Sequence, residues 1–172
     1  EDSEIPKAVS RVTGIHFETL KNGFAPEEIW RHLNRCIAET AAALRKKLQN
    51  EMSIHKLDAV LILQNADLFY FTGSIQQGAL YVPPQGEPLY LVRKDHGRAR
   101  MESGLKEVLP FTSPRDIEGV LNDFDYPMPA ILGMELDVIP VTVLKRFKKA
   151  MGGCQVEDAT PLIRTVPESG SP

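Results

Sequence analysis

The sequence predicts an α/β domain with a mixed, mostly parallel sheet, and three observations lead to that fold class. Residues 26–51 repeat apolar side chains every three or four positions, which is the period of an amphipathic helix. Residues 57–63 are almost wholly apolar, as expected for a strand that helices cover on both faces. Residues 78–82 and 88–92 flank a Pro-Pro-Gln-Gly turn, which predicts an antiparallel hairpin and one reversed strand.

The remaining elements follow from capping and turn residues. Pro26 suits a first helical position, and Glu27 and Glu28 suit the positive end of the helix dipole. Further along, we expect a helix over 94–103, a strand over 107–111, a helix opened by Ser113-Pro114, a strand over 130–133, a helix from Pro140 to Gly152-Gly153 and an edge strand over 154–158.

These patterns divide the chain into three parts. Residues 1–25 contain helix and strand breakers and are an unassigned N-terminal extension. Residues 26–166 hold every predicted element, although 161–166 are expected to trail off without a helix or strand. Residues 167–172 have the composition of a linker or a truncated tail.

Composition excludes several classes of function. The 172 residues make about one domain, and the net charge of −3 gives no reason to expect a nucleic-acid partner. No apolar run approaches the ~20 residues that cross a bilayer, so we expect no membrane segment. Two cysteines without a CxxC motif provide neither a disulfide framework nor a zinc site, which favours the cytoplasm.

No catalytic motif is present, and we expect no catalytic or metal-ligating residue in this chain. The phosphate-binding, HExxH and GxSxG motifs are absent, and the four histidines are expected to lie in different elements. Asp58, Glu135 and Asp137 follow or precede predicted strands and could hold Mg²⁺ for a nuclease. A nuclease of that kind also needs an acid within the first strand, where 59–63 are apolar, and Asp137 is better explained as a helix cap.

The segment NADLFYFTG, residues 65–73, is the main candidate for function. Asn65 is the predicted cap of a helical turn that Gly73 ends, with Phe69 and Tyr70 expected in the core. The segment follows the carboxyl end of the first strand, which is the edge where open α/β sheets bind ligands. Core packing does not require the polar residues after it, so the candidates for a pocket or an interface are Phe71, Thr72, Gly73, Ser74, Gln76 and Gln77.

Arg93 is the remaining candidate and begins the basic sequence RKDHGRAR. Such a cluster is consistent with a solvated helix face. It is also consistent with contact to a carboxylate ligand or to an acidic patch on another domain, because arginine binds carboxylates in a bidentate manner.

Taken together, the order of these motifs resembles a known family. LDAVLILQNADLFYFTG, then GEPLYLVR at 86–93, Gly133-Met134-Glu135 and Leu162-Ile163-Arg164 are similar to the N-terminal domain of Xaa-Pro peptidases, prolidases and creatinase. The resemblance covers roughly residues 40–166. It implies a ribonuclease H-like three-layer α/β sandwich without that enzyme's acids, whose role is to support oligomerisation and one wall of a substrate pocket.

The resemblance also implies what this chain lacks. In the family, two divalent metal ions (Mn, Co or Zn) are bound in a C-terminal catalytic domain, which is missing here. We therefore expect no cofactor and no activity in this chain alone, and a parent that is a dimeric metallopeptidase acting on proline-containing peptides. Two alternatives stay open: a stand-alone binding or regulatory module, and the N-terminal domain of a creatinase-like amidinohydrolase.

Overall fold

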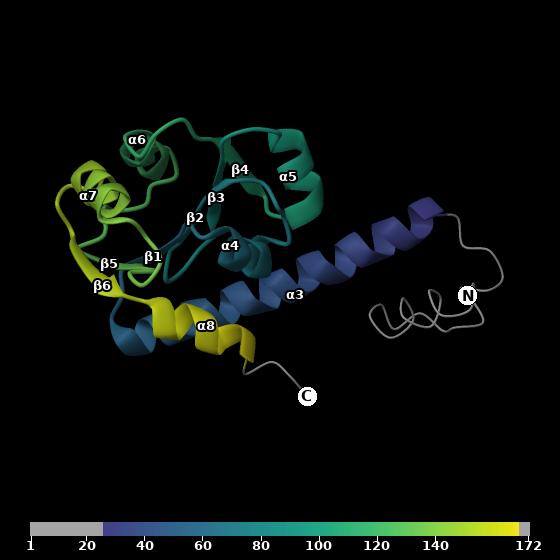
Figure 1. The fold of residues 1–172 in the computed structure, drawn as a ribbon, viewed down its shortest axis with the longest axis horizontal. Coiled ribbons are helices and arrows are strands. Elements are labelled where there is room, and N and C mark those ends of the chain that lie inside the picture. Colours follow the sequence, from purple (N-terminus) through teal and green to yellow (C-terminus); the bar gives the residue numbers. More distant parts are fainter. Residues whose placement is uncertain (1–25, 169–172) are drawn as a thin grey trace.

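The structure, a computed structural model, describes residues 26–168, and the unassigned extension 1–25 lies outside them. Its elements are α3 (Pro26–His55), β1 (Ala59–Ile62), α4 (Asn65–Thr72), β2 (Gly78–Val82), β3 (Leu89–Val92), α5 (His96–Ser103), β4 (Glu107–Pro110), α6 (Asp116–Asp123), β5 (Ile131–Met134), α7 (Val141–Ala150), β6 (Gln155–Asp158) and α8 (Thr160–Glu168) (Figure 1). Each predicted helix and strand within these residues is present, with ends that differ by a few residues.

One mixed sheet forms the centre of the fold, with strand order β4-β3-β2-β1-β5-β6. β1 pairs in parallel with β5, as do β3 with β4 and β5 with β6, whereas β2 is antiparallel to both β1 and β3. β2 is therefore the one strand of this sheet that runs against the others. The predicted fold class, including the hairpin and its reversed strand, is confirmed.

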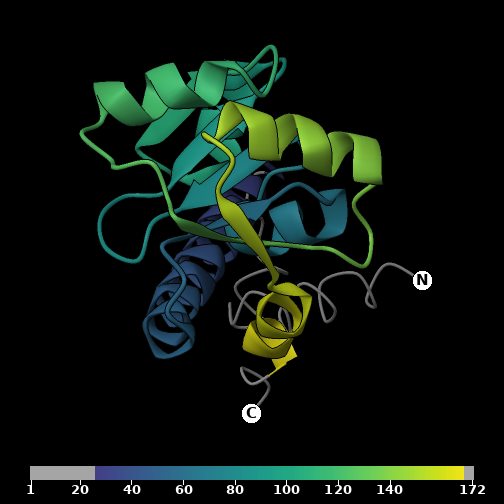
Figure 2. The same ribbon diagram turned by 90° about the vertical axis from the view of Figure 1, so that its left-hand side faces the viewer.

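Two helical layers cover the sheet. α3, α4, α5 and α8 pack against one face, and α6 and α7 pack against the other (Figure 2). Side chains along β1 point alternately to the two faces of the sheet. Val60 and Ile62 lie in the first core, under α3, α4, α5 and α8, and Ala59 and Leu61 lie in the second core, under α6 and α7. The first part of α3 projects beyond the sheet (Figure 1).

The expectation that 161–166 trail off was wrong, because residues 160–168 form α8. Ile163 and Val166 lie on one face of this helix and are buried in the first core, against α3. The Asp158 carboxylate accepts a hydrogen bond from the Thr160 amide at 3.0 Å and caps the helix. Hydrogen bonding to Thr160 is the main reason that the pKa of Asp158 lies below its ordinary value.

Asp137 does not cap α7, so that prediction was also wrong. Its carboxylate pairs with Arg164 of α8 at 2.6 Å and accepts a hydrogen bond from the Thr160 hydroxyl at 3.1 Å. Pro140 occupies the cap position of α7 instead. Asp137 therefore joins the loop after β5 to the final helix.

Candidate functional site

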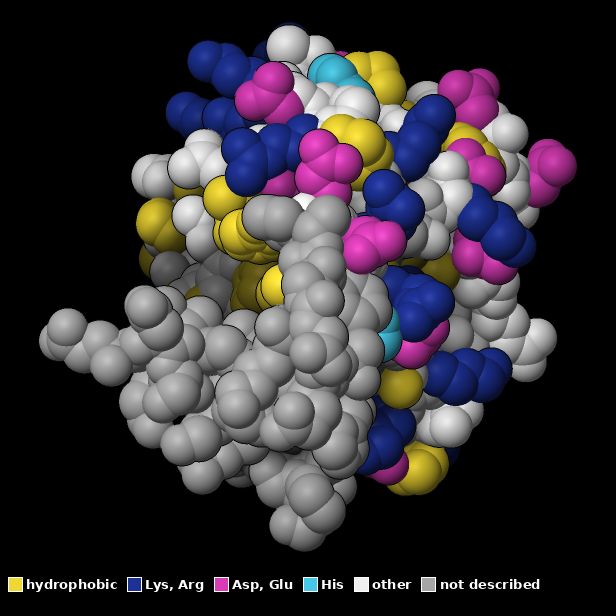
Figure 3. Space-filling model, turned by 90° about the vertical axis from the view of Figure 1, so that its right-hand side faces the viewer, with side chains coloured by type: hydrophobic (Ala, Val, Ile, Leu, Met, Phe, Trp, Pro, Cys, Tyr) yellow, Lys and Arg dark blue, Asp and Glu magenta, His cyan; other side chains and the backbone are white. Residues whose placement is uncertain are grey.

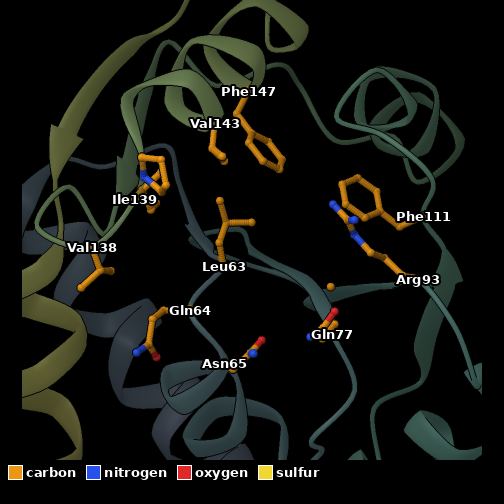
Figure 4. Close-up of a pocket in the computed structure, with 12 residues that line it drawn as sticks. Leu63, Gln64, Asn65, Gln77, Arg93, Phe111, Val138, Ile139, Val143 and Phe147 are labelled. Carbon is orange, nitrogen blue, oxygen red and sulfur yellow. The ribbon is translucent and has the colours of Figure 1, made fainter.

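A pocket of about 350 Å³ opens at the edge of the sheet where β1, β3 and β5 have their carboxyl ends (Figure 4). Its apolar half consists of side chains that also belong to the core under α6 and α7: Leu63, Phe111, Ile139, Val143 and Phe147. Its polar half consists of Gln64, Asn65, Gln77 and Arg93. Figure 4 shows Val143 and Phe147 facing the amides of Asn65 and Gln77 across the space, with Arg93 beside Phe111.

Backbone pairing fixes the positions of Arg93 and Phe111. The Arg93 amide donates to the Gln77 carbonyl at 3.0 Å, and the Phe111 amide donates to the Val92 carbonyl at 3.0 Å. The Arg93 guanidinium carbon lies 6.0 Å from the centre of the Phe111 ring, at the outer limit of a cation–π contact. Within residues 26–168, no carboxylate forms an ion pair with Arg93.

Gly78 allows β2 and β3 to lie close together at the pocket wall. A Cβ atom at this position would lie 1.9 Å from the Leu91 carbonyl oxygen, so only glycine allows β2 to approach β3 here. The close approach brings Gln77 next to Arg93.

Gln64, not Asn65, caps α4, which corrects the prediction. Gln64 has extended backbone angles, and its side-chain oxygen accepts a hydrogen bond from the Asp67 amide at 3.0 Å. The helix therefore begins at Asn65, one residue earlier than the sequence pattern suggested. The Asn65 side chain lines the pocket instead of capping the helix.

Glu135 connects the end of β5 to the end of β1. Its side chain is buried, and one carboxylate oxygen accepts hydrogen bonds from the Leu63 and Gln64 amides at 2.7 and 3.1 Å. Burial, and after it the neighbouring Asp67 carboxyl, raise the pKa of Glu135 to about 8, although the two amide hydrogen bonds oppose the shift. Near neutral pH the group is therefore mostly protonated. Its hydrogen bonds hold the backbone of Leu63 and Gln64, which line the pocket, in place.

The predicted candidates at 71–74 lie on the other face of the sheet. Phe71 is fully buried in the core under α3 and α4, and the buried Arg45 guanidinium donates to its carbonyl at 2.6 Å. The Thr72 hydroxyl donates to the Leu68 carbonyl at 2.6 Å and accepts from the Ser74 amide at 3.0 Å. These polar groups are already engaged within the domain.

Gly73 and Ser74 complete this tightly bonded turn. Gly73 has a φ of +72°, and a Cβ there would lie 2.8 Å from a methyl carbon of Ile37, which explains the need for glycine. The Ser74 hydroxyl donates to Glu102 at 2.7 Å, and Arg98 donates to the same carboxylate. Partial burial would raise the pKa of Glu102, but these bonds lower it overall.

The prediction that Phe69 and Tyr70 are core residues was wrong. They are 39% and 53% exposed, because α4 buries the stripe formed by Leu68, Phe71 and Thr72. Residues one and two positions after Leu68 must point away from that stripe. Two of the three consecutive rings therefore lie at the surface.

The structure thus brings Gln77 and Arg93 together and separates them from 71–74. Gln76 lies between the two groups, with its carbonyl bonded to the Tyr90 hydroxyl. Whether any of these residues contacts a substrate stays a prediction. Sequence reasoning missed Gln64, Phe111, Val143 and Phe147, although Gln64 comes two residues after β1 and Phe111 directly after β4, at the edge it had singled out.

The described residues do not bring metal-ligating side chains together. Among residues 26–168, no three His, Cys, Asp or Glu side chains are placed to share an ion, so the described residues do not fit a dinuclear centre.

In the same part of the chain, no helix has the length and apolar character needed to cross a bilayer. On the face toward which α3 projects, positive and negative side chains are interspersed over the described surface (Figure 3).

The class of protein that this structure defines is a three-layer α/β sandwich with one reversed strand in its sheet. Residues 45–166 match the model of the Creatinase/Prolidase N-terminal domain, and the chain belongs to that family. A comparison with curated proteins gave no match.

Solved structures share the fold. The N-terminal domain of the cytoplasmic peptidase PepQ from Mycobacterium tuberculosis H37Rv is 22% identical with a TM-score of 0.61, over 72% of this chain and 98% of that one. A proline dipeptidase structure from Streptococcus pneumoniae is 19% identical with a TM-score of 0.62, over 72% and 96%. The prolidase from Pyrococcus horikoshii is 22% identical with a TM-score of 0.60, over 71% of this chain but only 34% of that one.

Proposed function

We propose that this chain is the non-catalytic N-terminal domain of a cytoplasmic, dinuclear-metal Xaa-Pro peptidase. The family match over residues 45–166 is the observation that carries the proposal. The Pyrococcus horikoshii prolidase supports it, because this chain corresponds to 34% of that protein and leaves room for a further domain. The two metal ions and the hydrolytic step would belong to that further domain, and no catalytic step is assigned to residues 26–168.

The domain's own contribution would be a wall of the substrate pocket and a contact between subunits. Gln76, Gln77 and Arg93 lie at or near the carboxyl edge of the sheet, where ligands of α/β folds bind. Phe69, Tyr70 and Ile75 are apolar or aromatic, close in sequence and 39%, 53% and 64% exposed. Such side chains favour burial against a second domain or a second copy.

Paired variants in the full-length parent test both roles. Gln77→Ala should raise KM for a Gly-Pro substrate about fivefold, the effect of losing one hydrogen bond of ~1 kcal/mol. The double change of Tyr70 and Ile75 to Ser should shift the parent toward monomer in light scattering. Gln85→Ala, in the hairpin turn at the opposite edge of the sheet, is the control and should change neither.

Equal kinetics and equal mass for all variants would contradict the proposed contacts. A parent that hydrolyses creatine but no Xaa-Pro peptide would place the domain in an amidinohydrolase. A reading frame without a catalytic domain would make the chain a stand-alone module.

A further inference from the structure

We propose that the pocket at the carboxyl edge binds a small carboxylate with an apolar body, and that this domain suffices for binding. Such ligands include an apolar amino acid and the carboxyl end of a short peptide. Arg93 is the one charged side chain among the twelve residues that line the pocket. Its guanidinium has no ion-pair partner within residues 26–168, and its paired donors match the two oxygens of a carboxylate.

The opposite wall fits an apolar body. The side chains of Leu63, which follows β1, of Ile139, which precedes α7, and of Val143 and Phe147 in α7 converge on the space and face the polar half (Figure 4). A volume of about 350 Å³ falls in the range of roughly 300–1,000 Å³ that small-molecule pockets occupy. A ligand with one charged and one apolar end would therefore bind in a single orientation.

Unused amide donors surround the Arg93 side. Gln64 uses its side-chain oxygen to cap α4, which leaves its NH₂ group available to donate. In the described part of the chain, the side-chain amides of Asn65 and Gln77 make no hydrogen bond. Three amides and a guanidinium around one apolar space are the sparse polar contacts that fix a ligand's orientation.

The pocket is held in shape without a ligand. Glu135 binds the amides of Leu63 and Gln64, and the β2–β3 pairing holds Gln77 against Arg93. A preformed site loses little conformational freedom on binding, which favours affinity. This inference goes beyond the proposed function, because it assigns a ligand to this domain itself, and its failure would leave the family role untouched.

Titration of the chain with N-acetyl-leucine, followed by ¹H–¹⁵N NMR, tests the proposal. We expect saturable shifts of the Gln64, Asn65 and Gln77 side-chain amides with a Kd of roughly 1 mM, typical of so small a ligand. N-acetyl-leucinamide, which has the same body without the charge, should bind at least tenfold more weakly. Free leucine as a third probe separates a free amino acid from a peptide's carboxyl end, and tighter binding of either one supports the proposal.

Two variants and a control locate the site. Arg93→Gln should weaken binding of N-acetyl-leucine at least tenfold, whereas Lys94→Gln removes the same charge next to the pocket and should not change it. Val143→Phe should abolish binding by filling the apolar half while Arg93 stays in place, with circular dichroism confirming the fold.

Three results would overturn the proposal. They are equal binding of the acid and the amide, shifts confined to residues outside the pocket, and no saturation at about 10 mM ligand, a tenfold excess over the expected Kd.

Discussion

The two faces of the sheet at its carboxyl edge treat their polar residues differently. On the α3–α4 face, Thr72, Ser74 and Arg45 all bond to other groups of the domain. On the α6–α7 face, Arg93 and Gln77 line an open pocket, and within residues 26–168 Arg93 forms no ion pair and the Gln77 side chain forms no hydrogen bond. Thr72 and Ser74 flank Gly73, and Gln77 precedes Gly78, so the two groups look alike in sequence. A polar residue is therefore a candidate for ligand binding only when the fold leaves its hydrogen-bonding groups unused.

Truncation of Phe71 should have the largest effect on the structural face. Phe71→Ala removes a fully buried ring, so the free energy of unfolding should fall by about 3–5 kcal/mol. Urea denaturation followed by circular dichroism measures the loss. Tyr70→Ala, the neighbouring ring that is 53% exposed, is the control and should cost under ~1 kcal/mol. Equal losses for the two variants would contradict the assignment of faces.

Substitution of Arg45 should have the second largest effect on the free energy of unfolding. Burial lowers the pKa of Arg45 to about 10, and its guanidinium donates to the Phe71 carbonyl at 2.6 Å. Arg45→Met keeps most of the volume but leaves that carbonyl without this donor, so unfolding should become easier by about 2–3 kcal/mol. The exposed neighbour offers a control, since Lys46→Met should change stability by less than ~0.5 kcal/mol. An unchanged free energy of unfolding in Arg45→Met would show that the hydrogen bond from Arg45 to the Phe71 carbonyl does not stabilise the fold.

Glu135 should make stability depend on pH. Its pKa is raised in the folded state to about 8 from 4.5, so the folded protein holds more protons than the unfolded chain between these values. Stability should therefore fall as pH rises from about 5 to 8, and level off above. Glu135→Gln should remove most of this slope and raise stability by about 1–3 kcal/mol at pH 8. Urea titrations at several pH values measure this slope, and an unchanged slope in the variant would contradict the raised pKa of Glu135.

Arg93 should have the smallest effect on stability. Its side chain is exposed and forms no ion pair within the described residues, so Arg93→Gln should change the free energy of unfolding by less than ~0.5 kcal/mol. Thermal melts of the variant and the parent chain provide the comparison. A loss above ~1 kcal/mol would place Arg93 with the structural residues of the other face.

The fold was predictable because its strongest signals are local. The stripe of α3, the turn between β2 and β3 and the charged outer face of α7 each specify an element without knowledge of its neighbours. α8 was missed because Pro161 and Pro167 are typical of a tail without regular structure. Ile163 and Val166 are buried against the apolar stripe of α3, and that tertiary contact cannot be read from the local sequence.

The candidate site was only partly predictable, for a related reason. Arg93 and Gln77 could be chosen as candidates from the sequence. Phe111 and Phe147 line the same pocket only because of the order of the strands in the sheet, and the sequence does not reveal that order. The burial of Phe71 and exposure of Tyr70 depend on which side of α4 meets α3. Adjacent residues of similar chemistry cannot reveal that choice.

The central claim is that this chain supports an active centre that lies in another domain. The most direct test is hydrolysis of a Gly-Pro dipeptide by the purified 172-residue chain with Mn²⁺ or Co²⁺ present. Release of proline should be no faster than in a blank that contains the metal alone. Turnover that rises with the concentration of the chain would contradict it.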